Sequence, residues 1–80
     1  MTREEVYDRL NPVFQDVFDD ESITVKDSTT SDDIEDWDSF EHINLCVAVE
    51  QEFGFKFPMG KINTMKNVGD MVDIILQMGK

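Results

Sequence analysis

Residues 38–54 read DSFEHINLCVAVEQEFG, and this stretch predicts the central helix of the fold. Asp38 is a good N-cap residue, and Glu41 three positions later completes a capping-box pattern, so we expect the helix to begin at Ser39. Gly54 is expected to end it. Four apolar residues are spaced to form one buried face: Leu45, Cys46, Val49 and Phe53.

The same helix carries a second apolar stripe that a small core does not require. Phe40, Ile43 and Val47 follow one another at helical spacing and are expected to turn partly outward. An exposed apolar stripe of this kind indicates a surface that a partner covers.

A first helix is predicted near the start of the chain. Thr2 and Glu5 form a capping box, in which a hydroxyl and a carboxylate satisfy free backbone donors. Pro12 is expected to kink or split this helix near Asn11, because an interior proline removes a hydrogen bond and clashes with the preceding turn. The apolar stripe of the helix consists of Val6, Leu10, Val13, Phe14, Val17 and Phe18.

A last helix is predicted near the other end of the chain. Asn67 and Asp70 cap its start, and Gly79 is expected to end it. Its apolar face consists of Val68, Met71, Val72, Ile75 and Leu76.

Two connectors join these helices. Residues 19–38 lose the helical period, which predicts a long loop pinned by Ile23, Val25, Ile34 and Trp37. Residues 55–58 form an apolar connector, and Met59 to Asn63 are expected to form a short helical turn. With no repeat and no linker, the predicted fold class is all-α. We expect a small bundle of three main helices plus one short turn, in a single domain over residues 1–80.

The charge of the chain restricts its partners. Seven Lys plus Arg and 18 Asp plus Glu among 80 residues give a net charge of −11, which argues against nucleic acid and anionic membranes and favours a basic protein partner. The longest apolar run, residues 45–49, is far too short to span a membrane, and the N-terminus lacks the features of a secretory signal. One cysteine cannot form an internal disulfide, which favours a cytoplasmic location.

Ser39 is the residue that points most directly to chemistry. At the first helical position its hydroxyl lies beside unpaired backbone N–H groups and the positive end of the helix dipole, where a phosphodiester would be stabilised. From spacing alone, a polar residue within a helix cap is the favoured interpretation.

The sequence supports other kinds of functional site less strongly. His42 lies one turn after Ser39, but no third group orients a nucleophile–base pair, so we predict no catalytic residue and expect His42 to face solvent on the partner side. Six acidic residues from Asp32 to Glu41 lack the glycine of an EF-hand loop, which predicts weak, delocalised divalent binding rather than a dedicated metal site. Cys46 is expected to be a small buried hydrophobe.

Three segments follow the order of a known family. Residues 38–40 read Asp-Ser-Phe at the start of the central helix, residues 55–58 read FKFP, and residues 67–75 read NVGDMVDII. In these motifs, and in length, acidity and helix order, the chain resembles the acyl carrier proteins, whose second helix opens with Asp-Ser-Leu. The resemblance covers essentially the whole chain.

The resemblance implies a carrier rather than an enzyme. Ser39, flanked by Asp38 and Phe40, would carry a 4′-phosphopantetheine arm that a phosphopantetheinyl transferase attaches from coenzyme A. The arm would hold acyl or aminoacyl groups as thioesters and deliver them to loading ligases or synthases with basic docking surfaces. The implied partner surface consists of Phe40, Glu41, Ile43, Asn44, Val47 and Glu50.

The family's four-helix bundle can also shelter an acyl chain between its helices. Soft, adaptable side chains suit that role, and here they are Met59, Met65 and Met71. From the residues alone, ordinary core filler is the favoured interpretation of the methionines, and sheltering a chain is a secondary consequence.

Some residues depart from the fatty-acid carriers. Asp36 and Trp37 replace the Gly-Ala pair often found there, and together with His42 they resemble stand-alone carriers of specialised pathways. Asn44 and Gln51 stand where fatty-acid carriers usually place acidic residues. We therefore expect a monomeric carrier of a specialised pathway, such as polyketide biosynthesis, with a fatty-acid biosynthesis carrier as the nearest variant.

Two functions from other classes remain open. One is an acidic adaptor that binds proteins without a prosthetic group, and the other is a hydrolase that uses Ser39 and His42. Attachment of the arm separates the carrier from both.

Overall fold

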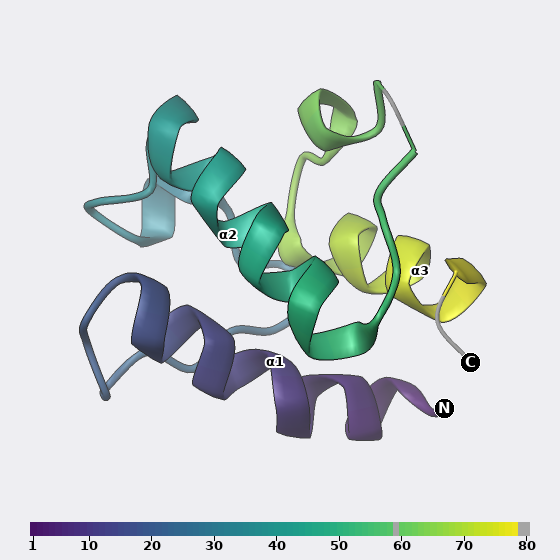
Figure 1. The fold of residues 1–80 in the computed structure, drawn as a ribbon. Helices are drawn as coiled ribbons and strands as arrows, with labels where there is room; N and C mark the ends of the chain where they lie inside the picture. Colours follow the sequence, from purple (N-terminus) through teal and green to yellow (C-terminus); the bar gives the residue numbers. More distant parts are fainter. Residues whose placement is uncertain (59, 79–80) are drawn as a thin grey trace.

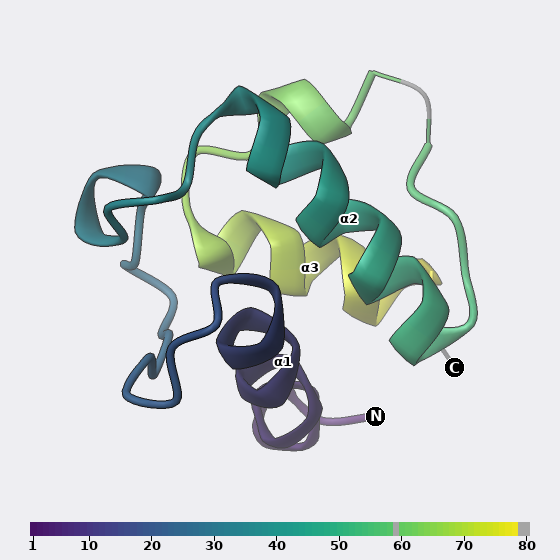
Figure 2. The ribbon, with the colours of Figure 1, turned by 60° about the vertical axis from the view of Figure 1, so that its left-hand side comes forward.

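Three α-helices build the bundle in the computed structural model, which describes residues 1–58 and 60–78. α1 spans Arg3–Val17, α2 spans Ser39–Phe53 and α3 spans Val68–Met78. α1 packs against both of the other helices, and the views in Figures 1 and 2 show α2 and α3 lying over it. The described residues contain no strand, so the all-α prediction is confirmed.

The connectors contain two short 3₁₀ helices, η1 (Ser31–Asp33) and η2 (Ile62–Thr64). η2 overlaps the end of the region where a short helical turn was expected, and it begins later in the chain. The described part of the chain therefore has three α-helices and no fourth, since the additional turn is only a single turn of 3₁₀ helix. Met59 and Gly79, to which the sequence assigned the start of this turn and the end of the last helix, lie outside the described residues.

The helices begin at the predicted capping residues, and α2 also ends at one. Thr2 Oγ1 accepts a hydrogen bond from the Glu5 amide at 3.1 Å, and the Glu5 carboxylate accepts one from the Thr2 amide at 2.8 Å, which confirms the capping box. Asn67 Oδ1 accepts a hydrogen bond from the Asp70 amide at 2.8 Å. Gly54 ends α2 in the left-handed conformation, with φ at 71°.

α1 runs through Pro12 without a break, so the predicted split is wrong. Pro12 lies on the exposed side of the helix, where the Asp8 carbonyl that loses its amide partner can bind water instead. The buried residues Leu10 and Phe14 flank the proline, and their packing keeps the helix continuous across it.

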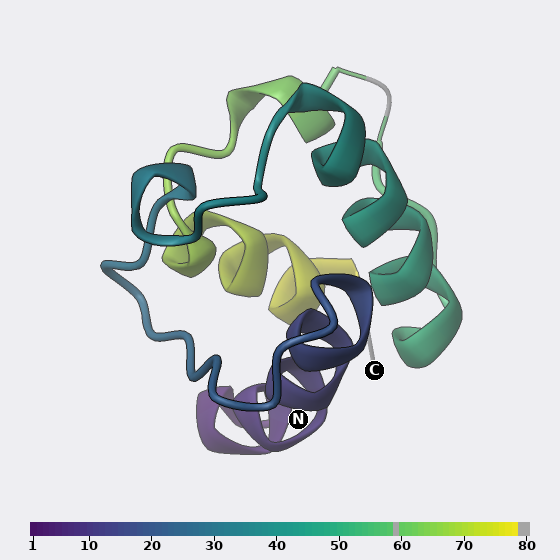
Figure 3. The ribbon, with the colours of Figure 1, turned by 90° about the vertical axis from the view of Figure 1, so that its left-hand side faces the viewer.

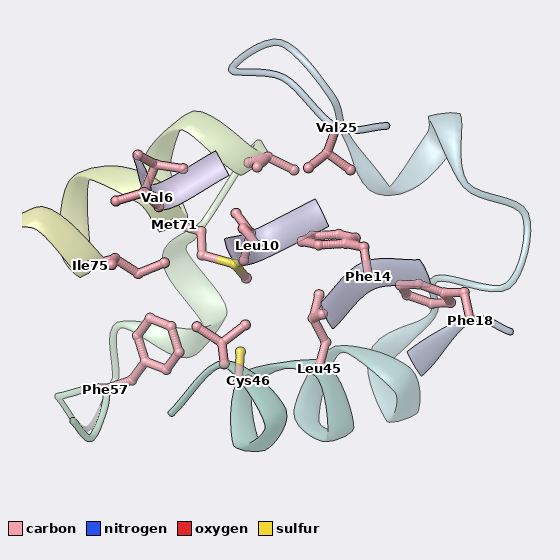
Figure 4. Packing of buried hydrophobic residues seen from close by; sticks show 13 residues of the cluster. Val6, Leu10, Phe14, Phe18, Val25, Leu45, Cys46, Phe57, Met71 and Ile75 are labelled. Atoms are coloured by element: carbon pink, nitrogen blue, oxygen red, sulfur yellow. The ribbon is translucent and has the colours of Figure 1, made fainter. Parts of the chain in front are cut away.

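The core is formed by side chains from the three α-helices, the long loop and the connector after α2. Figure 4 shows residues of all three α-helices, Val25 of the long loop and Phe57 of the connector pointing toward one centre. The predicted inward face of α2 is confirmed except at Phe53, which is only partly buried and is covered by the Arg9 guanidinium, 4.7 Å from its ring centre. Burial of these apolar surfaces is the main force that stabilises the bundle.

The long loop between α1 and α2 lies across the start of α3 (Figure 3). The Val68 amide donates to the Thr29 carbonyl at 2.8 Å, and the Gly69 amide donates to the Asp27 carbonyl at 3.0 Å. Amides in the first turn of a helix have no partner within it, so the loop backbone satisfies them. A Cβ at position 69 would lie 3.0 Å from the Asp27 oxygen, and this close approach explains the glycine.

Candidate functional site

Ser39 lies at the first position of α2, with an exposed side chain. The helix begins there because the Asp38 carboxylate accepts a hydrogen bond from the Glu41 amide at 2.8 Å. The capping box is only half formed, since the Glu41 carboxylate accepts a hydrogen bond from the Asn44 side chain at 3.0 Å instead of bonding the N-cap amide. The first backbone hydrogen bond of the helix runs from the His42 amide to the Asp38 carbonyl. The Ser39 and Phe40 amides come before it and have no carbonyl partner within the helix.

Trp37 holds the chain that enters α2. Its ring meets Phe14 edge-on, with centroids 5.4 Å apart, and lies 6.1 Å from the ring of Phe18. Its backbone amide also donates to the Ile34 carbonyl at 3.1 Å. The expectation that Trp37 pins the loop onto the bundle is therefore confirmed, and the anchor lies two residues before Ser39.

His42 does not face solvent, and that prediction is wrong. Its side chain is partly buried and stacked on Trp37, with ring centroids 5.8 Å apart. Nδ1 lies 3.1 Å from Trp37 Nε1, and Nε2 lies 2.7 Å from the Ile62 carbonyl oxygen. Because the indole only donates and the carbonyl only accepts, Nδ1 must accept and Nε2 must donate, which is the neutral Nε2–H tautomer.

A pocket of about 300 Å³ opens beside Ser39. It lies between the start of α2, η2 and the start of α3, and it brings Ser39, Asp38, Trp37 and His42 together with a segment that follows twenty or more residues later. The residues that line it are Ser31, Trp37, Asp38, Ser39, His42, Ile62, Asn63, Met65, Lys66, Asn67 and Met71. No local spacing links Ile62, Asn63, Lys66 or Asn67 to the serine, so their place at this site could not be predicted from the sequence.

Comparison with known proteins identifies the family of the chain. A curated acyl carrier protein of Coprothermobacter proteolyticus is 34% identical over 77 residues, covering 94% of this chain and 92% of the relative. The chain belongs to the acyl carrier protein family. An acyl carrier protein of Acidothermus cellulolyticus is 29% identical over 75 residues, covering 94% of this chain and 89% of that protein. No protein-family model matches the chain.

A solved carrier structure has the same fold. The solution NMR structure of a holo acyl carrier protein from Geobacter metallireducens superposes with a TM-score of 0.83 at 42% identity, covering 90% of this chain and 83% of that chain. As an acyl carrier protein, the chain is a carrier and not an enzyme, and its prosthetic group is a covalent 4′-phosphopantetheine. Carriers of this family interact with a phosphopantetheinyl transferase and with acyl-handling enzymes.

The start of α2 in this acyl carrier protein fits the phosphodiester of such a group. An exposed hydroxyl, two amides ahead of the hydrogen-bond ladder and the positive end of a 15-residue helix meet at Ser39. A hydrolytic pair of Ser39 and His42 is disfavoured, because both ring nitrogens of His42 already have hydrogen-bond partners and neither can take the serine proton.

The outward apolar stripe of the carrier lies on α2 beside this site. Phe40 is 81% exposed, Ile43 56% and Val47 46%, as the spacing predicted. Glu41 and Asn44 bond to each other along the edge of the stripe. The remaining predicted partner residue, Glu50, is half-buried and accepts a hydrogen bond from the Phe57 amide at 2.8 Å, so its carboxylate is turned toward the connector.

Cys46 belongs to the core of the carrier, as expected. Its side chain is fully buried, and burial together with the nearby Glu50 carboxylate raises the pKa of the thiol to about 12. Met71 is buried as well, and Met65 is partly buried at the pocket.

Two further properties of the carrier concern ions and membranes. Within residues 1–58 and 60–78, no three His, Cys, Asp or Glu side chains come together in a way that could hold a metal ion. None of the helices in the described part of the chain is long and apolar enough to cross a membrane.

Proposed function

We propose that Ser39 is the attachment site of the 4′-phosphopantetheine arm, with Asp38 and Phe40 flanking it. The supporting observation is the exposed Ser39 hydroxyl at the open N-terminus of α2, directly beside the pocket. When bound, the group supplies a terminal thiol that holds an acyl or aminoacyl group as a thioester. Asp38 holds the helix start in place, and the free amides and helix dipole favour the phosphate.

The test is the intact mass of the protein after incubation with coenzyme A and a promiscuous phosphopantetheinyl transferase. We expect a gain of one phosphopantetheinyl group on the wild type and none on Ser39→Ala. Ser31→Ala is the matched control, because Ser31 is another exposed serine at the same pocket and its loss should leave loading unchanged. No gain on folded protein with several transferases would favour an acidic adaptor without a prosthetic group.

We propose that partner enzymes dock on α2. Support comes from the exposed stripe of Phe40, Ile43 and Val47, with Glu41 and Asn44 at its edge. The proposal also includes Glu50 one turn beyond, whose carboxylate accepts a hydrogen bond from the Phe57 amide. The apolar stripe would supply the contact area, and the net charge of −11 would attract basic enzyme surfaces over a distance. The partners in this proposal are the transferase and enzymes that load or elongate acyl or aminoacyl groups.

We also propose a role in a specialised pathway rather than in fatty-acid synthesis. The uncharged Asn44 and Gln51 support this, since they leave part of α2 without the acidic groups that a basic fatty-acid enzyme would meet. Adding charge with Asn44→Asp and Gln51→Glu is expected to raise the rate of acyl transfer to a fatty-acid ketosynthase. If the unmodified carrier already serves that enzyme as well as a fatty-acid carrier does, the specialised role is wrong.

The organisation of the chain is part of the same proposal. We infer one carrier domain over residues 1–80 that works as a monomer, supported by a single core that joins side chains of all three α-helices with Val25 of the long loop and Phe57 of the connector. A cytoplasmic location, favoured by the single cysteine, stays a prediction.

A further inference from the structure

The inward face of α2 leads from the pocket into the core. Ser39 lies at the mouth, His42 follows one turn later and lines the pocket, and Cys46 follows after another turn and is fully buried. The Cys46 sulfur lies 3.8 Å from His42 Nε2 and does not line the pocket. The imidazole therefore lies between the pocket and the apolar core.

The same imidazole joins two segments across the pocket. Nε2–H donates to the Ile62 carbonyl at 2.7 Å and so connects α2 to η2, while Nδ1 accepts from Trp37 at 3.1 Å and connects α2 to the loop before it. Both ring nitrogens are thus satisfied at a partly buried position. A group that separated α2 from η2 would leave the N–H and the carbonyl without partners, which is unfavourable away from water.

We propose that His42 is a specificity-determining residue, and that its bond to Ile62 keeps long alkyl chains out of the core and limits the carrier to short or polar acyl groups. The pocket outside this bond suits such cargo, because the polar side chains of Asn63, Lys66 and Asn67 line it beside the apolar Met65 and Met71. A long alkyl chain that passes between α2 and η2 has to break the bond to reach the apolar core around Cys46. This inference rests on the proposed attachment to Ser39.

The experiment loads the protein with butyryl, octanoyl and β-alanyl groups from the corresponding acyl-coenzyme A and a promiscuous transferase. The intact mass first verifies that one acyl-phosphopantetheinyl group is present. Cleavage of the thioester by hydroxylamine and the melting temperature then report whether the acyl group is sheltered. In the wild type we expect the octanoyl and butyryl thioesters to be cleaved at similar rates, without a rise in melting temperature for octanoyl.

His42→Leu removes the hydrogen bond and offers an apolar path. In this variant we expect octanoyl cleavage to become slower than butyryl cleavage by about fivefold or more, because each methylene that leaves water is stabilising. The β-alanyl thioester should not be protected. His42→Gln is the matched control, since its amide can still donate to Ile62, and we expect it to behave as the wild type.

The Trp37→Phe variant distinguishes the contributions of the two hydrogen bonds that the His42 imidazole makes. This variant removes the indole donor but leaves the bond to Ile62, so the octanoyl group should remain unsheltered. If octanoyl cleavage in the wild type is already about fivefold or more slower than butyryl cleavage, the inference is overturned, and this result does not depend on whether any variant folds. A failure to load any acyl group would instead overturn the attachment proposal itself.

Discussion

The Tyr7 hydroxyl of α1 donates a hydrogen bond to the Asp27 carboxylate of the long loop. The Arg3 guanidinium reaches the same carboxylate at 2.9 Å and Asp73 of α3 at 2.6 Å. These contacts join α1, the loop and α3. The loop backbone that caps α3 is thereby held in place from two sides.

This network makes stability depend on pH. The Tyr7 hydroxyl first, and then Arg3, lower the pKa of the Asp27 carboxyl below its ordinary value of 3.8. A carboxyl with a lowered folded-state pKa stabilises the fold above its unfolded pKa, and this stabilisation is lost as the pH falls through the folded value. We expect Asp27→Asn to destabilise the protein at pH 7 and to differ less from the wild type at pH 3, measured by urea unfolding.

Asp8→Asn is the matched control for this prediction. Asp8 is exposed on the same helix as Tyr7 but outside the network, so its substitution should change stability little at either pH. A difference between Asp27→Asn and the wild type that is equally large at pH 3 and pH 7 would contradict the role of the carboxylate.

Substitution by alanine should lower the stability of the protein strongly at Phe14 and hardly at all at Phe40. Phe14 is fully buried against Trp37, so Phe14→Ala is expected to cost about 3–5 kcal/mol and to unfold much of a domain of this size. Phe40 is 81% exposed, so Phe40→Ala should change stability by less than about 0.5 kcal/mol. Chemical denaturation measures both values.

Phe40→Ala should instead impair docking. We expect the transferase to modify this variant with a kcat/KM reduced by about fivefold or more, because an exposed aromatic beside the site is a typical contact residue at an interface. Met78→Ala is a control, since Met78 is an exposed apolar residue at the far end of α3. Unchanged loading of Phe40→Ala would remove Phe40 from the docking surface.

The Cys46 thiol should be unreactive in the folded protein. With its pKa raised to about 12 by burial, the thiolate fraction at pH 8 is about a thousandfold below that of an exposed cysteine. Ellman's reagent should detect no fast thiol in the unloaded native protein and one after unfolding in urea. After loading with phosphopantetheine, one fast thiol should appear, and it should persist in Cys46→Ala. A fast thiol in the unloaded native protein would show that Cys46 is exposed.

Salt should stabilise the carrier. The net charge is −11, so the acidic side chains repel one another and destabilise the fold. Ion pairs reduce this repulsion only in part, and they join Arg3 to Asp27 and Asp73, and Arg9 to Glu52. We expect the melting temperature to rise by about 5 °C from low to physiological salt, which corresponds to roughly 1 kcal/mol in a small domain. A comparison of magnesium chloride with sodium chloride at equal ionic strength tests for divalent binding. A melting temperature that stays constant or falls as salt is added would refute the prediction.

Residue spacing was sufficient to predict several features that depend on neighbours within one helical turn. The capping box of Thr2 and Glu5, the cap at Asp38 and the stop at Gly54 all follow from residues a few positions apart. The capping box at Glu41 and the split at Pro12 were wrong for different reasons. The Asn44 side chain, only three residues away, binds the Glu41 carboxylate instead of the N-cap amide. At Pro12, core packing on both sides of the proline keeps the helix continuous.

The sequence by itself determined the helix order, the buried and outward faces of α2 and the position of Ser39 at a helix start. Periodicity and capping act between residues near in the chain, so they can be read from spacing. Only the tertiary structure decided that His42 turns inward, because its partner Ile62 lies 20 residues away and reaches it only when η2 folds over α2. The pocket beside Ser39 arises in the same way, from segments that meet only after the bundle has formed.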